Sequence, residues 1–404
     1  MMPSNGRCIG CAARKVQIIL DLGPQPPSNR FFPPGQRQTD LHPLVLGQCG
    51  ECALVQLVDP MPEEMVRPRF QWLTYNEPEG HLDSLVDELV TSLELGPSAR
   101  IVGCSYKDDT TLARFNGRGF ANTYRYDMTA DLDIREPFAG LETLQRAVTD
   151  DLADGLVQKY GQADLCIVRH VLEHAHDPGK FLRAVSRLVK PSGAIVLETP
   201  ESTKFLTARD YSFLWEEHAA YFTPDTMRRV VQRAGLQPSS ILTYGYALED
   251  SLVAVVRPIP DTPVISPATA GELSLARTYG EGFEAVRGQT RGELLRLEAD
   301  GKRTAVFGAG HLAAKFLNFF DLQQAVHAVV DDNPHKLGLL MPGSGVLVRP
   351  SSVLLDERID LCLTSLSPES EAKVIASQRA YIAQGGEFRS IFPLSPIAHQ
   401  PRVA

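Results

Sequence analysis

Four cysteines, arranged as two Cys-x-x-Cys pairs, point most directly to chemistry in this chain. Each pair encloses a glycine, and the pairs are Cys8 with Cys11 and Cys49 with Cys52. Four thiolates at this spacing match the ligand set of one tetrahedral zinc ion. Because a closed four-cysteine site leaves no coordination position for a substrate, we predict a structural zinc. We expect Gly10 and Gly50 to permit the tight turn inside each pair.

Cysteine usage and composition limit the class of protein. The chain has 7 cysteines in 404 residues, and the other three lie singly in apolar runs with no signal peptide ahead of them, so we expect a reducing, cytoplasmic location. A net charge of −9, with no cluster of Lys and Arg near the cysteines, argues against a nucleic-acid partner. No apolar run reaches the roughly 20 residues that span a bilayer, so we expect no membrane partner. We expect a monomer or a homodimer.

A second set of polar residues follows a predicted strand at 99–103. Ligands of open α/β sheets bind beyond the carboxyl ends of the strands, so the turn that contains Gly103, Ser105 and Asp108 is a candidate cofactor site. Asp127 stands at the end of the next predicted strand, where an acid would hold ribose hydroxyls. The turn lacks a second glycine, and an ordinary strand-to-helix loop is the alternative.

Three histidines lie close together at His170, His174 and His176. On a helix, such residues could face solvent or cap its end instead of forming a site. Asp177 and Pro178 end the segment, and no carboxylate pairing fixes a ligand geometry, so we assign it no catalytic metal.

The elements that must position these residues fall into three units, which we place at 1–68, 69–257 and 268–404. A proline-rich stretch at 257–267 separates the last two. The middle unit alternates helical segments with strands predicted at 99–103, 121–127, 163–168 and 193–200, which is typical of a doubly wound parallel sheet. The last unit opens with a helix predicted over 271–302 and continues with strands at 304–310 and 326–334. Its Gly308-Ala-Gly310 turn lacks the third glycine of a dinucleotide site, although Asp331 or Asp332 stands where the ribose acid would be.

Taken together, these motifs resemble the three-domain, S-adenosylmethionine-dependent sugar C-methyltransferases of deoxysugar biosynthesis. The zinc unit is similar in its cysteines and in residues 22–31 and 49–57. The middle unit is similar at 163–174, 197–200 and 217–223, and the last unit at 308–310, 329–338 and 341–343. The resemblance implies a central Rossmann-like class I methyltransferase domain between an N-terminal zinc module and a C-terminal Rossmann-like domain. The implied reaction is methylation of carbon 3 in a nucleotide-linked 4-keto-6-deoxy sugar.

The same resemblance assigns roles to individual residues. It makes His218 the base that forms an enolate, Glu217 the acid beside it and His174 a donor to the enolate oxygen. Since adjacent strand residues point to opposite faces, Glu217 can reach His218 only from a loop, and we expect one there. The implied cofactor-binding residues are Gly103, Ser105, Asp108, Asp127, Arg169 and His170. The implied substrate-binding residues are Tyr75, Trp215, Tyr221, His311 and Lys315, with the last two near a phosphate.

Departures from the family pattern gather at the implied site. Gly103 stands where the family has an acid, Ser105 where it has a glycine, and Trp215 where it has a tyrosine. We expect C-methylation of a nucleotide-linked keto-deoxysugar or a related secondary metabolite, and a kept scaffold with a changed site leaves two alternatives open. One is a changed substrate or reaction, such as N- or O-methylation or transfer of another sulfonium substituent. The other is a non-catalytic binding or scaffold protein, against which the retained Glu217, His218 and His174 argue.

Overall fold

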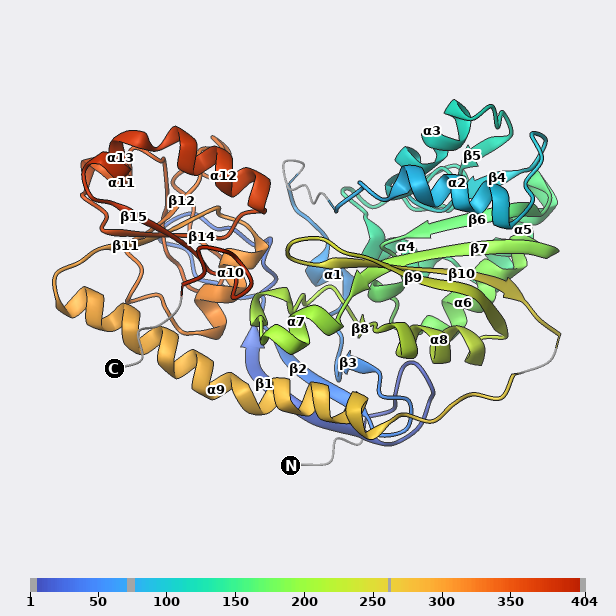
Figure 1. The fold of residues 1–404 in the computed structure, drawn as a ribbon, viewed down its shortest axis with the longest axis horizontal. Coiled ribbons are helices and arrows are strands. Elements are labelled where there is room, and N and C mark those ends of the chain that lie inside the picture. Colours follow the sequence, from blue (N-terminus) through green and yellow to red (C-terminus); the bar gives the residue numbers. More distant parts are fainter. Residues whose placement is uncertain (1–5, 71–76, 261–262, 400–404) are drawn as a thin grey trace.

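The computed structural model describes residues 6–70, 77–260 and 263–399, which form three β-sheets (Figure 1). The sheets have four, six and five strands, in the orders β1-β2-β3-β8, β5-β4-β6-β7-β10-β9 and β13-β12-β11-β14-β15. Among the described residues, no helix is long and apolar enough to cross a membrane.

The N-terminal sheet is antiparallel and crosses the domain boundary that we predicted. It contains β1 (Val16–Gln25), β2 (His42–Cys49) and β3 (Val55–Leu57), followed by the short helix α1 (Glu63–Val66). Its fourth strand, β8 (Ala220–Tyr221), comes from the middle unit of the chain and pairs Tyr221 with Val55. The loop that carries His218 is therefore anchored to the zinc unit.

The middle sheet has parallel strands and one reversed strand. Strands β4 (Ile101–Gly103), β5 (Thr123–Arg125), β6 (Ala163–Arg169) and β7 (Val189–Glu201) are parallel. Strand β10 (Asp250–Pro258) runs antiparallel to both β7 and the edge strand β9 (Leu236–Tyr244). The predicted α/β class with a doubly wound sheet is confirmed.

Alternating side chains of these strands enter two separate apolar clusters because successive strand residues point to opposite faces. Ile101, Leu165 and Val196 pack with α2 (Leu82–Ser92) and α3 (Asp109–Gly117). Val102, Cys166 and Ile195 pack on the other face with α5 (Asp150–Tyr160), α6 (Pro178–Arg187) and α8 (Pro224–Arg233). Two short helices, α4 (Leu141–Ala147) and α7 (Thr203–Ala208), border the carboxyl ends of the strands.

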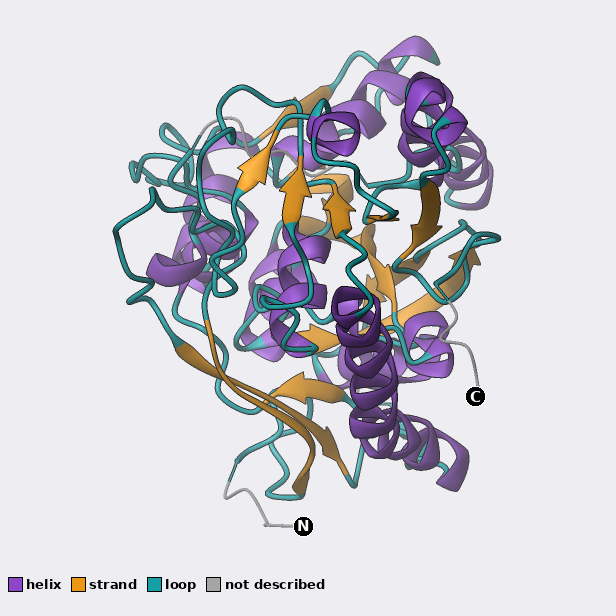
Figure 2. Cartoon of the chain, turned by 90° about the vertical axis from the view of Figure 1, so that its left-hand side faces the viewer, coloured by secondary structure: helices purple, strands orange, loops and turns teal. Residues whose placement is uncertain are grey.

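The C-terminal sheet is parallel throughout. Its strands are β11 (Thr304–Phe307), β12 (Ala328–Val330), β13 (Val348–Arg349), β14 (Leu361–Thr364) and β15 (Glu387–Ser390). The helices of this unit are α10 (His311–Phe319), α11 (Val353–Asp356), α12 (Pro368–Ser377) and α13 (Arg379–Ala383). Figure 2 shows this unit from its own side, with helices flanking the strands.

One long helix, α9 (Ala270–Ala299), joins the last unit to the rest, close to the predicted 271–302. Thr269 and Glu272 form a capping box at its start. The helix runs past the N-terminal sheet toward the C-terminal sheet (Figure 1). At Gly280 a Cβ atom would lie 1.9 Å from the carbonyl oxygen of Ile19, so glycine is what lets α9 approach β1 this closely. Side chains of all three units share one apolar cluster here.

Candidate active site and zinc site

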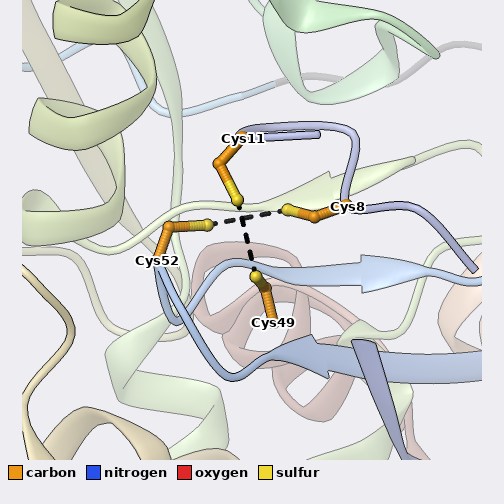
Figure 3. Close-up of side chains that lie close together, drawn as sticks. All are labelled: Cys8, Cys11, Cys49 and Cys52. Atoms are coloured by element: carbon orange, nitrogen blue, oxygen red, sulfur yellow. Dashed lines mark hydrogen bonds between the residues drawn. The ribbon is translucent and has the colours of Figure 1, made fainter. Parts of the chain in front are cut away.

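The four cysteine sulfurs converge on one point (Figure 3). The Sγ atoms of Cys8 and Cys52, and those of Cys11 and Cys49, lie 3.6 Å apart. Four sulfurs at about 2.3 Å from a tetrahedral zinc ion lie roughly 3.7 Å from one another, so the sulfurs fit this ion. The protein encloses the site, since Cys8, Cys49 and Cys52 are at most 2% exposed. A zinc ion here would hold the segment before β1 against the turn between β2 and β3.

The glycines inside the two pairs do not supply the turn, contrary to our prediction. The left-handed residues are Ala12 and Ala53, with φ of 62° and 61°, each directly after the second cysteine of its pair. Gly10 is needed for packing instead, because a Cβ atom there would lie 2.7 Å from Leu54 and 2.9 Å from Val230. At Gly50 the closest neighbour of a Cβ atom is at 3.5 Å, an ordinary contact.

The predicted cofactor turn is held by the carboxylate of Asp108. Its Oδ2 accepts from the backbone N–H groups of Cys104 and Ser105, each at 2.7 Å, and its Oδ1 accepts from that of Arg169 at 2.9 Å. Burial raises the pKa of Asp108 to about 7, and these donors oppose the rise. Since the side chain is 0% exposed, Asp108 shapes the turn and does not contact a cofactor, which corrects the prediction for this residue.

Gly103 and Ser105 lie in this turn, where the sequence placed them. A Cβ atom at Gly103 would lie 2.8 Å from that of Asp108, so the acid usual at this position has no room here. Ser105 caps the following turn, accepting from the N–H of Lys107 at 3.1 Å. Asp127 follows β5 with an exposed side chain. Its Oδ1 accepts from Thr129 and Ala130, which leaves Oδ2 for a ribose hydroxyl.

Arg169 and His170 belong to a buried ionic cluster that the sequence analysis missed. At its centre is Glu198, 0% exposed at the end of β7, which accepts from Arg169 at 2.6 Å and from Ser251 at 2.7 Å. Ring nitrogens of His81 and His170 lie 3.2 and 3.5 Å from its carboxylate. With its guanidinium committed to Glu198, Arg169 forms part of the scaffold at the carboxyl ends of β4, β6 and β7. Glu198 lies within the motif at 197–200, but its partners are distant in the sequence, so the local pattern could not predict these contacts.

His170 combines an unusual backbone with a strongly shifted pKa. It adopts a left-handed conformation, with φ of 55°, directly after β6. Burial favours its neutral form, but the carboxylates of Glu173 and Glu198 outweigh burial and raise its pKa to about 10. At neutral pH it is therefore an imidazolium between two carboxylates. Strained residues of this kind gather at functional sites.

The structure brings His174 and His218 together from separate segments. Their rings meet edge to face with centroids 4.9 Å apart. His174 is buried in the 3₁₀ turn Leu172–His174, and His218 is half-buried in a loop after residue 213, as expected for the segment that carries Glu217. Burial lowers the pKa of both imidazoles, and for His218 the neighbouring His174 and His311 add to the effect. Both rings are thus neutral at neutral pH.

The acid beside these two rings is Glu173 instead of Glu217. An oxygen of Glu173 and one ring nitrogen each of His174 and His218 all lie within 4.8 Å of one another. The Glu217 carboxylate groups instead with Glu216 and His311. Burial, followed by the charges of Glu216 and Glu142, raises the pKa of Glu217 well above its usual range.

His174 is turned away from the donor role that the resemblance implied. Its Nδ1 lies 2.9 Å from the carbonyl oxygen of Glu217, and a carbonyl can only accept. The proton of the neutral ring therefore sits on Nδ1, and Nε2 carries a lone pair. In this tautomer His174 cannot donate a hydrogen bond to an enolate oxygen.

The implied substrate residues have three different outcomes. Trp215 stacks on His311 with ring centroids 3.5 Å apart and on His218 at 5.6 Å, so it lines the site. Tyr221 is buried and donates its hydroxyl to the Trp215 carbonyl at 2.8 Å, a supporting role. Tyr75 lies outside the described residues.

His311 and Lys315 are buried against Glu216, contrary to the predicted phosphate contact. Lys315 is 1% exposed and forms an ion pair with Glu216, and His311 Nε2 lies 3.5 Å from the same carboxylate. Glu216 also accepts from the backbone N–H of Ser28. Because its charge is already balanced and covered, Lys315 cannot reach a phosphate in this structure. The cluster joins residues of all three units at one junction.

Asp331, the alternative ribose acid of the C-terminal unit, is likewise committed. Its carboxylate accepts from the backbone N–H of Ala309 at 3.0 Å and from Lys336 at 2.8 Å. It therefore fixes the Gly308 turn.

Comparison with known proteins identifies all three units. Residues 8–66 match a zinc binding domain, residues 75–241 a methyltransferase domain and residues 268–394 a C-methyltransferase C-terminal domain. The C-methyltransferase NovU of Streptomyces niveus is 24% identical over 378 residues, which cover 90% of this chain and 88% of NovU. The chain is an S-adenosylmethionine-dependent methyltransferase with the domain composition of a C-methyltransferase. The predicted family, the methyltransferase activity and the zinc module are thereby confirmed.

More distant similarities cover the central unit of the enzyme. A ubiquinone biosynthesis O-methyltransferase of Dinoroseobacter shibae is 30% identical over 110 residues, 25% of this chain and 43% of that protein. The solved 1,6-didemethyltoxoflavin-N1-methyltransferase of Burkholderia thailandensis aligns with 45% of this chain and 80% of its own, at 14% identity and a TM-score of 0.30.

Proposed function

We propose that this enzyme methylates a carbon next to the ketone of a nucleotide-linked keto-deoxysugar or a related secondary metabolite. The observation that carries the proposal is the similarity to NovU over 90% of the chain, through three domains in the same order. The arrangement of the central site supports it, because a neutral imidazole stands in a half-buried loop at the carboxyl ends of the sheet.

In this proposal the donor lies along the turn at Gly103 and Ser105. Asp127 holds the ribose hydroxyls through Oδ2, and Asp108, with its three backbone hydrogen bonds, keeps the turn in shape. S-adenosylmethionine supplies an electrophilic methyl group on a sulfonium. His170 closes the donor site through its fixed, left-handed backbone.

His218 acts as the base. Its neutral ring removes the proton from the carbon beside the ketone, and the C–H electron pair becomes the enolate. The enolate carbon then forms the new C–C bond while the methyl–sulfur bond breaks, which requires in-line approach. Trp215, stacked on His218, holds the ring in place. Glu217, with its raised pKa, is the acid of the same loop.

A changed acceptor is the second candidate function, and one observation favours it. The resemblance placed Lys315 and His311 near the substrate phosphate, but Lys315 is buried and paired with Glu216, and burial lowers the pKa of His311 to about 3. An acceptor without a nucleotide diphosphate does not need them. N- or O-methylation, or transfer of another sulfonium substituent, would use the same donor site.

Calorimetric titration with S-adenosylmethionine and S-adenosylhomocysteine tests the donor site. Asp127→Asn should weaken binding of both at least about tenfold, because each lost charge-assisted hydrogen bond is worth about 1.5–3 kcal/mol. Asp133→Asn is the matched control, since Asp133 is also exposed and its carboxylate pairs with Arg135. Absence of binding to the wild-type enzyme would refute the proposal. Product mass after incubation with keto-sugar nucleotides and with simple amines or phenols then separates the two candidates.

A further inference from the structure

The carboxylate of Glu173 is buried near the site without a hydrogen-bond donor. Its residue is 2% exposed, and neither oxygen accepts a hydrogen bond from the described part of the chain. Its nearest charged neighbour is His170, whose Nδ1 lies 3.4 Å from Oε1. Burying a carboxylate without hydrogen bonds costs several kcal/mol, so a charge of this kind points to a ligand that provides the missing contacts.

Two imidazole lone pairs face the same place. The His174 ring gives its Nδ1 proton to the Glu217 carbonyl, which leaves Nε2 as a Lewis base. A histidine that ligates a metal almost always donates its other N–H in this way, to a carbonyl or a carboxylate. His218 lies edge to face with His174, its ring centroid 4.9 Å away, and it is reachable because its loop is half-buried.

We propose that Glu173, His174 and His218 bind a divalent transition-metal ion such as Zn²⁺. One carboxylate oxygen and two ring nitrogens lie within 4.8 Å of one another. Two imidazoles and one carboxylate are a ligand set that zinc, cobalt and manganese accept. At bond lengths of about 2.0–2.2 Å, tetrahedral ligand atoms lie roughly 3.4 Å apart, so small side-chain rotations close the site. Three protein ligands leave the fourth position open to water or an oxygen of the substrate.

A second cluster of possible metal ligands lies nearby, but a lysine ammonium already occupies the position that a cation would take. Glu216, Glu217 and His311 also lie within 4.8 Å of one another, but Lys315 already balances the charge of Glu216. Among the described residues, only the Glu173 cluster combines a buried carboxylate that accepts no hydrogen bond with two imidazoles. From the sequence we assigned no metal to the segment of His170 and His174. The third ligand, His218, comes from a distant loop.

Ion binding itself goes beyond the proposed function, whereas the effect of the ion on catalysis rests on the proposed role of His218. The ion and the substrate proton compete for the same lone pair of His218. While the ion is bound, His218 cannot act as the base, so the ion would regulate proton removal at this site.

Cobalt(II) is the probe for the test, because its visible absorption reports bound ion directly. The zinc-containing full-length protein is titrated with Co²⁺, and uptake beyond the four-cysteine site is followed by absorption and by metal analysis. We expect one further ion per chain, bound at least about tenfold more weakly in Glu173→Gln and in His218→Gln. Glu201→Gln is the matched control and should bind as wild type. Glu201 is 4% exposed at the end of β7, and its carboxylate accepts from the backbone N–H of Thr203 at 2.9 Å.

Two results would overturn the inference. One is a wild-type protein that takes up no ion beyond the cysteine site. The other is Co²⁺ binding that both ligand variants retain at wild-type strength. His218→Gln keeps the test available if Glu173→Gln fails to fold, since His218 is only half-buried. Either negative result leaves the S-adenosylmethionine titration unaffected, so failure here is distinct from failure of the proposed function.

Discussion

The junction of Glu216 with Lys315 should control how firmly the three units hold together. The carboxylate of Glu216 lies at 0% side-chain exposure between the ammonium of Lys315 and the backbone N–H of Ser28. In Glu216→Gln the amide oxygen can still accept from Ser28, so the change removes the charge and keeps the shape. Lys315, 1% exposed, is then left as a buried cation.

The size of the effect follows from that burial. Breaking a buried ion pair by neutralising one partner costs about 3–5 kcal/mol, because the remaining charge is uncompensated. The ring of Phe319, 5.4 Å from the Lys315 ammonium, offsets little of this, since a cation–π contact is worth about 0.5–2 kcal/mol. Lys315→Met alone should cost a similar amount by leaving Glu216 unpaired. The double variant should lose far less stability than the sum of the two single-variant losses, because replacing both partners of a buried ion pair by uncharged residues often changes stability little.

Urea unfolding followed by tryptophan fluorescence measures this directly. Trp215 stacks on His311 within the junction and reports its opening. The chain has 2 tryptophans, so Trp72→Phe in every variant isolates that signal. The reasoning is refuted if Glu216→Gln shifts the free energy of unfolding by less than about 0.5 kcal/mol, or if the two single effects add in the double variant.

Three further predictions concern the scaffold. Removing zinc with a chelator should unfold the N-terminal unit and lower the calorimetric melting temperature, because structural zinc contributes on the order of 10 kcal/mol to the folding free energy. An unchanged melting profile would contradict this prediction. Gly280→Ala should lower the free energy of unfolding by about 1–3 kcal/mol, because its Cβ atom would lie 1.9 Å from the carbonyl oxygen of Ile19. Gly288→Ala lies on the same helix with no atom within 4 Å of its Cβ position, and it should raise the free energy of unfolding by up to about 1 kcal/mol. Urea titrations measure both changes. Burial opposes ionisation of Asp131, but Lys159 and nearby hydroxyl and backbone donors lower its pKa to about 2. Because the pKa of Asp131 in the folded state is below its ordinary value, the carboxylate should contribute about 1 kcal/mol to the free energy of unfolding above pH 4, and this contribution should be lost as the pH falls toward 2. In chemical denaturation, Asp131→Asn should remove this pH dependence.

Features encoded over short distances were predictable from the sequence. The two Cys-x-x-Cys pairs fixed the zinc ligands because each pair is local and the number of sulfurs matches one ion. Helix α9 was predictable as a long polar helical stretch, and the parallel strands of the middle and C-terminal units were predictable from apolar runs between helical segments. The order of three domain motifs determined the family, as the comparisons confirm.

Only the tertiary structure decided which charged groups meet. Glu173 lies near His218, and Lys315 pairs with Glu216, because loops at the ends of two different sheets bring these residues together. The pairing of β8 with β3, which fixes the His218 loop on the zinc unit, likewise joins residues far apart in the chain. Spacing along the sequence carries no information on such contacts, because they depend on how whole units dock. Burial then sets the pKa of each group and decides whether a lysine is free for a phosphate or is committed to a carboxylate.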